Sequence, residues 1–148
     1  MSHDLAIDAP SGFRRLLGYR LAEWGDGYAV IALEVDGRHL NRSEVVHGGV
    51  YGALIDAAGG YAGCYCTVPG NVRRAFTLSL STSFVASTAS GRLRAIARKS
   101  GGGRSVFFAR VEVLDENGRL LATGEGVYRY RHGSERPDGV PLGAGDQS

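Results

Sequence analysis

Most of the chain alternates apolar and polar residues in short runs, but one long segment is apolar almost throughout. This segment, residues 48 to 66, is built mainly of Gly, Ala, Val, Leu, Ile and Tyr, and residues 67 to 70 (Thr-Val-Pro-Gly) end it. Its length predicts a helix of about 28 Å. Because apolar residues lie nearly all around that helix, we expect it to be buried rather than to lie on a surface.

Period-two alternation predicts strands on both sides of this helix. The alternating runs are residues 19–23, 28–35, 76–85, 92–98, 104–114 and 120–130. The first two runs flank a Gly-Asp-Gly turn, and Asp115-Glu-Asn-Gly118 is a hairpin turn before the last run. Residues 10 to 18 allow a short helix. One long helix and an antiparallel meander of strands predict an α+β fold.

Length and charge exclude several classes of protein. The 148 residues are enough for one domain with one core and too few for two ordinary domains. A net charge of +2 is too small for an electrostatic footprint on nucleic acid. There is no charge-free apolar run of about 18 residues, and the first residues lack the pattern of a signal peptide. We therefore expect a cytoplasmic protein that does not cross a membrane.

Cysteine and histidine spacing gives no sign of a metal site or a disulfide. Cys64 and Cys66 are two residues apart on the predicted helix, where they do not face each other, so we expect two reduced thiols. No CxxC or HxxxH pattern is present, and the histidines lie far apart in the sequence. We therefore expect no metal.

Residues 41 to 56 hold most of the candidate chemistry. They read Asn-Arg-Ser-Glu-Val-Val-His-Gly-Gly-Val-Tyr-Gly-Ala-Leu-Ile-Asp. Gly48 and Gly49 open the predicted helix, where the first amides lack partners and the helix dipole is positive, so they can hold an oxyanion. Asp56 lies among apolar residues, where a carboxylate either has a partner or acts as a general base or nucleophile.

This arrangement resembles the hotdog-fold acyl-CoA thioesterases, in particular the phenylacetate-pathway (PaaI-like) and 4-hydroxybenzoyl-CoA thioesterase-like branch. That branch has an Asn, His-Gly-Gly six residues later, and an Asp eight residues after the first Gly. Asn41, His47-Gly48-Gly49 and Asp56 match this spacing, and the likeness covers about residues 10 to 131. It implies a sheet wrapped around one long central helix, in a homodimer or homotetramer.

The resemblance also implies an activity. The protein would hydrolyse an acyl-CoA, with an aryl or a short- to medium-chain acyl group, to the free acid and CoA, without a metal or redox cofactor. One alternative is a non-catalytic acyl-CoA-binding hotdog protein, although such regulators usually add a DNA-binding domain for which this chain has no room. Another is a hotdog dehydratase or hydratase, which uses a catalytic His with an acid in a spacing that fits this chain poorly.

Individual roles also follow from the resemblance. The Gly48 amide polarises the thioester oxygen, and Asp56 acts across a dimer interface on substrate held at the partner's Gly-Gly end. Asn41 orients the attacking water or the thioester, His47 positions the substrate carbonyl or the loop, and Thr77 matches a Ser or Thr close to the acid. From the residues alone, Asn41 could equally form a turn, His47 could satisfy backbone groups, and Thr77 could be an ordinary strand residue.

Residues 98 to 105 join two predicted strands and hold three consecutive glycines between cations. Exposed amides and charged donors of this kind can cradle a phosphate, although a flexible hairpin with solvated charges has the same composition. By the resemblance, this turn contacts CoA, and the residues that follow the Thr77 strand lie beside it. The predicted substrate-binding residues are Gly49, Phe84, Val85, Ser87, Thr88, Lys99, Ser100, Gly101, Gly102, Gly103, Arg104 and Ser105.

Two further expectations concern the helix aromatics and the chain ends. Tyr51, Tyr61 and Tyr65 either line an aromatic or medium-length pocket or belong to the core. We expect residues 10–132 to form the domain, after a loose leader at residues 1–9. Residues 133–148 are rich in Gly, Pro, Ser and Asp without periodicity, which predicts a disordered tail.

Overall fold

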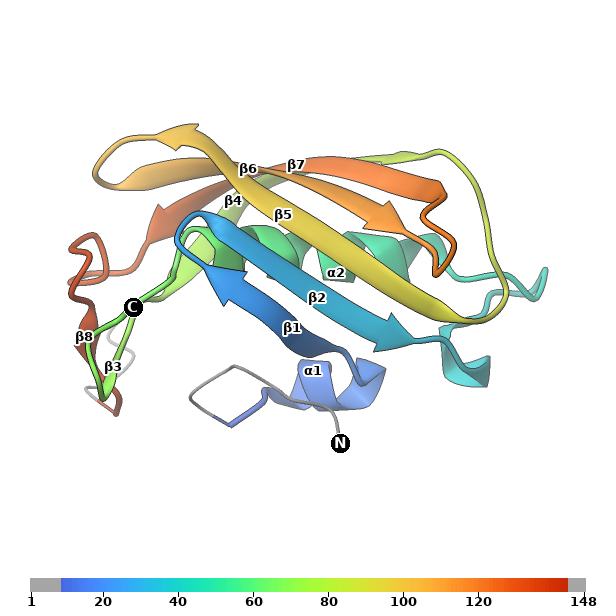
Figure 1. Ribbon diagram of the computed structural model, residues 1–148, viewed down its shortest axis with the longest axis horizontal. Coiled ribbons are helices and arrows are strands. Elements are labelled where there is room, and N and C mark those ends of the chain that lie inside the picture. The colour runs from blue at the N-terminus through green and yellow to red at the C-terminus, as the bar shows by residue number, and fades with distance from the viewer. Residues whose placement is uncertain (1–8, 144–148) are drawn as a thin grey trace.

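Six antiparallel strands form one curved sheet in the computed structural model of the protein, which describes residues 9–143 (Figure 1). The sheet order is β1-β2-β5-β6-β7-β4, so β1 and β4 are its edges. The strands are β1 (Arg20–Gly25), β2 (Tyr28–Glu34), β4 (Ala75–Phe84), β5 (Arg92–Gly102), β6 (Val106–Leu114) and β7 (Leu120–Tyr130). The predicted leader lies outside the described residues, except for Ala9.

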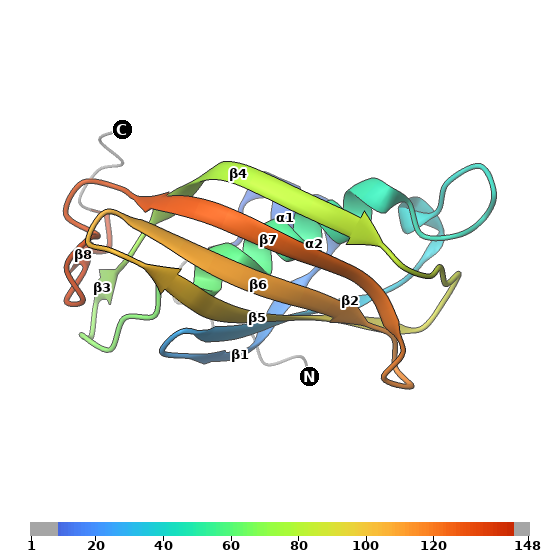
Figure 2. The same cartoon turned by 90° about the horizontal axis from the view of Figure 1, so that it is seen from above.

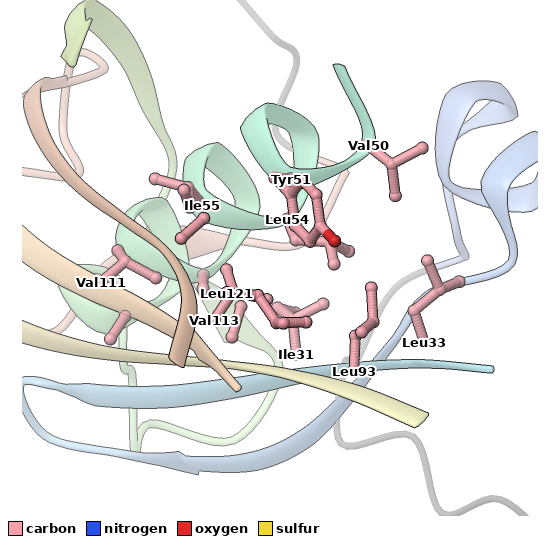
Figure 3. Close-up of a cluster of buried hydrophobic side chains, with 14 of the residues drawn as sticks. Ile31, Leu33, Val50, Tyr51, Leu54, Ile55, Leu93, Val111, Val113 and Leu121 are labelled. Carbon is pink, nitrogen blue, oxygen red and sulfur yellow. The ribbon is translucent and has the colours of Figure 1, made fainter. Parts of the chain in front are cut away.

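One long helix, α2 (Gly48–Ala62), lies across one face of this sheet, as Figures 1 and 2 show from two directions. Leu54, Ile55 and Ala58 on the helix are fully buried. The strand residues in the same core include Ile31, Leu93, Val111, Val113 and Leu121 (Figure 3). Because every second strand residue points toward the helix, the alternating pattern supplies one apolar face. The prediction of an α+β fold around one central helix is confirmed.

Two glycines allow the helix to approach the sheet closely. A Cβ atom on Gly124 of β7 would lie 2.5 Å from Cγ2 of Ile55, and one on Gly59 of α2 would clash with the hydroxyl of Tyr128. Larger residues at these positions would push α2 away from β7. The spacing between Asp56 and the sheet therefore depends on these two residues.

α2 ends at Ala62, four residues before the predicted end at residue 66. The hydroxyl of Tyr130 donates to the carbonyl oxygen of Gly63 at 2.6 Å, and this oxygen would accept from the amide of Thr67 if the helix continued. The ring of Phe107 packs where a Gly63 side chain would lie. Contacts from β6 and β7 thus end the helix.

The helix is buried on one side only. Gly52, Ala53, Asp56, Ala57 and Gly60 are all half-exposed. The prediction of a helix buried all around is therefore wrong for a single subunit, because the sheet covers only one face of it. The uncovered face is built of small residues and one carboxylate.

Residues 131–143 form a short return that we call the C-terminal clasp. Its strand β8 (Val140–Pro141) pairs with β3 (Asn71–Val72) in a separate two-stranded sheet. Within the clasp, Ser134 is buried, and its carbonyl oxygen accepts from Nε of Arg73 at 2.9 Å.

The clasp overturns the prediction of a disordered tail for residues 133–143. The sequence there has no periodicity, but hydrogen bonds from Arg73 and the pairing with β3 hold it in place. Such contacts come from residues about 60 positions away and leave no local pattern. Residues 144–148 lie outside the described part of the chain.

Two short helical segments precede α2. α1 (Gly12–Leu17) is capped by Ser11, whose hydroxyl accepts from the amide of Arg14, and η1 (Gly37–His39) is a 3-10 turn in the link from β2. Within residues 9–143, none of the helices has the length and apolar character needed to cross a membrane.

Candidate active site

Asp56 lies in the middle of α2, on its half-exposed side, where β4 passes. The hydroxyl of Thr77 on β4 donates to Oδ1 of Asp56 at 2.5 Å. The hydroxyl of Tyr128 on β7 donates to the backbone oxygen of Asp56 at 3.2 Å. Burial, with a smaller contribution from the Asp56 charge, raises the pKa of Tyr128, so this hydroxyl stays a donor. The carboxylate is thus held between a helix and two strands.

The start of α2 is capped by His47. Nδ1 of His47 accepts from the amide of Gly49 at 2.8 Å, so a neutral His47 carries its proton on Nε2. This contact bears out the alternative interpretation, that His47 satisfies a backbone group, and its role toward the substrate carbonyl stays a prediction. In the described part of the chain the Gly48 amide has no hydrogen-bond partner, and it stands at the positive end of the helix dipole beside the ring of Phe84. This amide is available to an anionic oxygen.

Asn41 forms a turn. Its side-chain oxygen accepts from the amides of Ser43 at 2.9 Å and Val45 at 3.3 Å. The interpretation as a turn residue is confirmed, and the same turn brings Asn41 and His47 to one shallow hollow on the surface. Thr88 is tied to this region, because its carbonyl oxygen accepts from the amide of Val46 at 2.9 Å.

The structure separates these residues into two groups within one subunit. Asn41, His47 and Gly48 lie at the start of α2, and Asp56 lies eight residues further on, about 12 Å along the helix axis. A carboxylate and an amide that act on one carbonyl must both come within about 3 Å of the reacting atoms. One subunit alone therefore does not bring Asp56 to its own Gly48.

The glycine-rich turn is shorter than predicted. β5 continues to Gly102, with Gly101 and Gly102 paired to β6, and the amide of Gly103 donates to the oxygen of Val106 at 2.8 Å. The prediction that these glycines form an open cradle of amides is wrong in this respect. The exposed polar side chains at the turn include those of Lys99, Ser100, Arg104 and Ser105.

This turn and the residues after β4 lie at opposite ends of the sheet. Phe84 pairs with Ala122 on β7, whereas the oxygen of Ser105 accepts from the amide of Tyr130. These two positions of β7 are about 27 Å apart along the strand. Val85, Ser87 and Thr88 follow Phe84 at its end of the sheet, so the prediction that residues 84–88 lie beside the turn is wrong within one subunit.

A cavity of about 350 Å³ opens beside Asp56 and Thr77. Its lining includes three aromatic side chains and three arginines. These are Trp24, Tyr61, Tyr128, Arg73, Arg74 and Arg131. Trp24 is held in place, because its Nε1 donates to the backbone oxygen of Tyr61 at 2.8 Å and its ring meets the Tyr61 ring edge-on.

The helix tyrosines divide between cavity and core. Tyr61 lines the cavity beside Asp56, whereas Tyr51 is buried in the core, as Figure 3 shows. Tyr65 lies beyond the end of α2, where its ring contacts Trp24. Cys64 also lines the cavity, and burial raises the pKa of its thiol from 9.0 to about 12, so it is a poor nucleophile at neutral pH.

Sequence reasoning missed several residues of this cavity. Tyr128 occupies an inward position of the last alternating run, which marks it as buried but not as a neighbour of Asp56. Arg73 and Arg74 form an adjacent basic pair before β4, a signal that could have been noted. Nothing in the sequence shows that they meet Arg131. Among residues 9–143, no cluster of three or more His, Cys, Asp or Glu could hold a metal ion.

Comparisons with known proteins give a consistent result. The family described as the thioesterase superfamily matches residues 44–122. The Thermoplasma volcanium protein TV1331, provisionally named an esterase, is 30% identical over 117 residues, which cover 79% of this chain and 86% of that protein.

Two solved structures extend the comparison. A variant of the phenylacetic acid degradation protein PaaI from Thermus thermophilus is 30% identical, with a TM-score of 0.69 over 82% of this chain and 99% of that chain. A thioesterase from Haemophilus influenzae is 23% identical, with a TM-score of 0.72 over 80% and 82% of the two chains, which shows a shared fold.

Proposed function

Because the chain belongs to the thioesterase superfamily, we propose that Asp56 and the Gly48 amide form the catalytic centre of a hotdog-fold acyl-CoA thioesterase. The protein is a thioester hydrolase that converts an acyl-CoA and water to a free acid and CoA. The observation that carries the assignment of the centre is the Asp56 carboxylate, held by Thr77 beside a cavity on the uncovered face of α2.

The chemistry assigns a role to each group. The Gly48 amide donates to the thioester oxygen as it gains negative charge, and one such donor typically contributes about 3 to 4 kcal/mol to transition-state stabilisation. The Asp56 carboxylate either removes a proton from water or attacks the carbonyl carbon directly. His47 holds the helix start, and Thr77 holds the carboxylate in orientation. This scheme uses no metal or redox cofactor.

We further propose that the site is composite, with Asp56 of one subunit acting at the Gly48 end of its partner. Two antiparallel α2 helices facing each other would bring each Asp56 beside the partner's Gly48. The uncovered face of α2 and the edge strand β4 support this arrangement. β4 exposes four large apolar side chains, namely Phe76, Leu78, Leu80 and Phe84, with Val85 directly after it, and a bulge at residues 77–79 turns Phe76 to the opposite face from Leu80 and Phe84. An exposed apolar edge of this length favours association with a second copy.

The remaining assignments are proposed on the resemblance. Lys99, Ser100, Arg104 and Ser105 contact the nucleotide of CoA, and dimers pair again into a homotetramer. A cytoplasmic location is consistent with the free thiols of Cys64 and Cys66. Mass measurement by light scattering tests the tetramer.

Asp56→Asn tests the catalytic assignment. The variant should keep its fold and assembly and lose roughly a hundredfold or more in kcat, since the amide is neither a base nor a nucleophile. Glu125→Gln, which removes an exposed carboxylate on β7, is the matched control and should retain normal turnover. Near-normal turnover of Asp56→Asn would remove Asp56 from the mechanism. Wild-type protein that binds acyl-CoA without hydrolysing any would instead support the non-catalytic alternative.

Mixed dimers test the composite site. Subunits carrying Asp56→Asn are combined with subunits carrying Gly48→Pro, which lack the amide donor, and the doubly tagged heterodimer is purified. It should regain one working site of two, although each parent is inactive. A folded heterodimer with no activity would refute the composite site.

A further inference from the structure

His39 is a fully buried histidine that the proposed mechanism does not use. It ends the 3-10 turn η1, and it is 0% exposed. A buried imidazole requires hydrogen-bond partners for its ring nitrogens, because they lose their contact with water. The contacts of this residue connect the end of α1 to the start of α2.

Both nitrogens of the His39 ring are bound. Nδ1 accepts from the backbone amide of Asp36 at 2.9 Å, and Nε2 lies 2.7 Å from the carbonyl oxygen of Leu17, the last residue of α1. An amide only donates and a carbonyl only accepts, so these two contacts together require a neutral ring with its proton on Nε2. The contact with Leu17 therefore leaves Nδ1 as the acceptor that closes the turn.

An ion pair between a protonated His39 and Asp36 would be a different use of the same ring. Oδ1 of Asp36 lies 3.5 Å from Nδ1, which is longer than the contact of Nδ1 with the Asp36 amide. The carboxylate is half-exposed, and Nε of Arg38 donates to its two oxygens at 3.2 and 3.1 Å. The shorter amide contact, and the arginine already bound to the carboxylate, favour the neutral acceptor.

The backbone of His39 holds the residue that caps α2. Its carbonyl oxygen accepts from the backbone amide of His47 at 2.8 Å. Nδ1 of His47 in turn accepts from the amide of Gly49 at 2.8 Å. The Gly48 amide lies between these two bound amides in the chain, so its direction depends on where the His39 peptide is held.

We propose that His39 is a positioning residue for thioester hydrolysis, an assignment that rests on the function and the catalytic centre proposed above. The imidazole fixes the peptide whose carbonyl oxygen holds His47, and His47 aims the Gly48 amide at the thioester oxygen. A donor of this kind stabilises the transition state only when it points at the oxygen that gains charge. Loss of the His39 ring should therefore weaken catalysis although Gly48 itself is unchanged.

Two substitutions at His39 test the proposal by kinetics. His39→Leu keeps apolar bulk and removes both ring contacts, and we expect about tenfold lower kcat with a KM changed by less than about twofold. His39→Asn places a side-chain oxygen near the position of Nδ1, where it can accept from the Asp36 amide, and should recover most of the loss. Arg38→Met is the matched control, because Arg38 also binds α1 from this turn, through the oxygen of Leu16 at 2.7 Å. It should retain normal kcat.

Mixed dimers show at which end of the site His39 acts. In a heterodimer with Asp56→Asn, the His39→Leu subunit supplies a normal Asp56 to a partner with an intact Gly48 end, so one of the two sites should work at the wild-type rate. In a heterodimer with Gly48→Pro, the remaining site uses the impaired Gly48 end and should stay at the low rate. The reverse pattern would place the effect of His39 at Asp56 and overturn the proposal.

The amide signals of Gly48 and Gly49 test the same claim without turnover and without a composite site. In assigned magnetic resonance spectra of protein with isotope-labelled glycine, both signals should move in His39→Leu. They should return toward their wild-type positions in His39→Asn and stay there in Arg38→Met. Unchanged signals in His39→Leu would overturn the proposal, because the Gly48 amide would then be held without the His39 ring.

Contrary kinetic outcomes have separate meanings. Normal kcat in His39→Leu, or equal losses in His39→Leu and His39→Asn, would overturn the proposal and leave the thioesterase function standing. An equal loss in Arg38→Met would assign the effect to the attachment of α1 and also overturn it. No hydrolysis of any thioester by the wild-type protein would refute the function itself, and the proposal with it. Circular dichroism confirms the fold of each variant. If His39→Leu does not fold, His39→Gln takes its place, because its longer amide is expected to reach Leu17 and to leave the Asp36 amide without its acceptor.

Discussion

At the scale of single residues, the hydroxyl of Thr77 is the contact that connects the edge strand to the candidate catalytic acid. It fixes one oxygen of Asp56, a residue that lines the cavity, and leaves the other oxygen without a bond to Thr77. The orientation of the carboxylate matters for catalysis, because a general base must point toward the proton that it removes. A small change in this contact should therefore affect kcat more than KM.

Thr77→Val should lower kcat by about tenfold with little change in KM, because it keeps the shape of the side chain and removes the donor. Thr77→Ser should restore most of the activity. Thr82→Val, on the same strand but outside the cavity, is the control for substitution on β4. Steady-state kinetics with the acyl-CoA that gives the highest kcat/KM measure kcat and KM for each variant. A normal kcat in Thr77→Val would mean that the hydrogen bond has no catalytic role.

The buried thiol of Cys64 should make the free energy of unfolding depend on pH in the alkaline range. Burial raises the pKa of this thiol from 9.0 to about 12, so the unfolded state loses the proton first and is favoured as pH rises through that range. In this range the Cys64 thiol lowers the free energy of unfolding by at most about 1.4 kcal/mol per pH unit. Urea unfolding between about pH 8 and about pH 10 should show a decline that is flatter in Cys64→Ala. Cys66→Ala, at a half-exposed thiol, serves as the comparison, and equal slopes in both variants would contradict this account.

The site residues that the sequence predicts are those whose spacing is local. Asp56, Gly48 and His47 were identified because their spacing is local, within one helix and its cap. Asn41 and His47 turned out to satisfy nearby backbone groups, which was one of the interpretations considered. Tyr128 and Arg131 could not be placed beside Asp56, because only the folding of β7 onto α2 brings them there.

At the scale of elements, the strands were predictable and the end of the helix was not. Period-two alternation places β7 at the residues expected, 120 to 130, because one face of the strand must be apolar. The end of α2 depends on Tyr130 and Phe107, which are far from it in sequence. A local pattern cannot reveal a cap supplied by another element, and the clasp escaped prediction for the same reason.

Tyr130→Phe tests the cap on α2. The variant keeps the ring and leaves the buried oxygen of Gly63 without its donor, which should lower the free energy of unfolding by about 1 to 3 kcal/mol. Tyr28→Phe, at a half-exposed ring on β2, should change it by less than about 0.5 kcal/mol. Urea unfolding of the two variants under identical conditions gives the comparison. If both lost equal stability, the hydroxyl of Tyr130 would not cap the helix.

At the scale of the whole molecule, the uncovered face of α2 and the edge strand β4 form one continuous region around Asp56. The core closes on the other face of the helix, so the exposed side chains of this region are left uncovered in a single subunit. Its apolar side chains and its carboxylate share the surface where the proposed partner would supply Gly48. Assembly and catalysis are therefore expected to fail together, in a way that changes at other surfaces would not reproduce.

Leu78→Arg tests this link. Leu78 is 52% exposed on β4, so the substitution should be tolerated by the subunit while placing a charge in the proposed interface. We expect a monomer by light scattering, with a native circular dichroism spectrum and at least a hundredfold lower kcat, because each Asp56 loses the partner's Gly48 amide. Phe108→Arg is the matched control, since Phe108 is 45% exposed on β6, two strands from the β4 edge. It should keep the assembly and the turnover of the wild-type protein. A monomeric Leu78→Arg protein with normal turnover would show that one subunit holds a complete site, and the composite arrangement would then have to be abandoned.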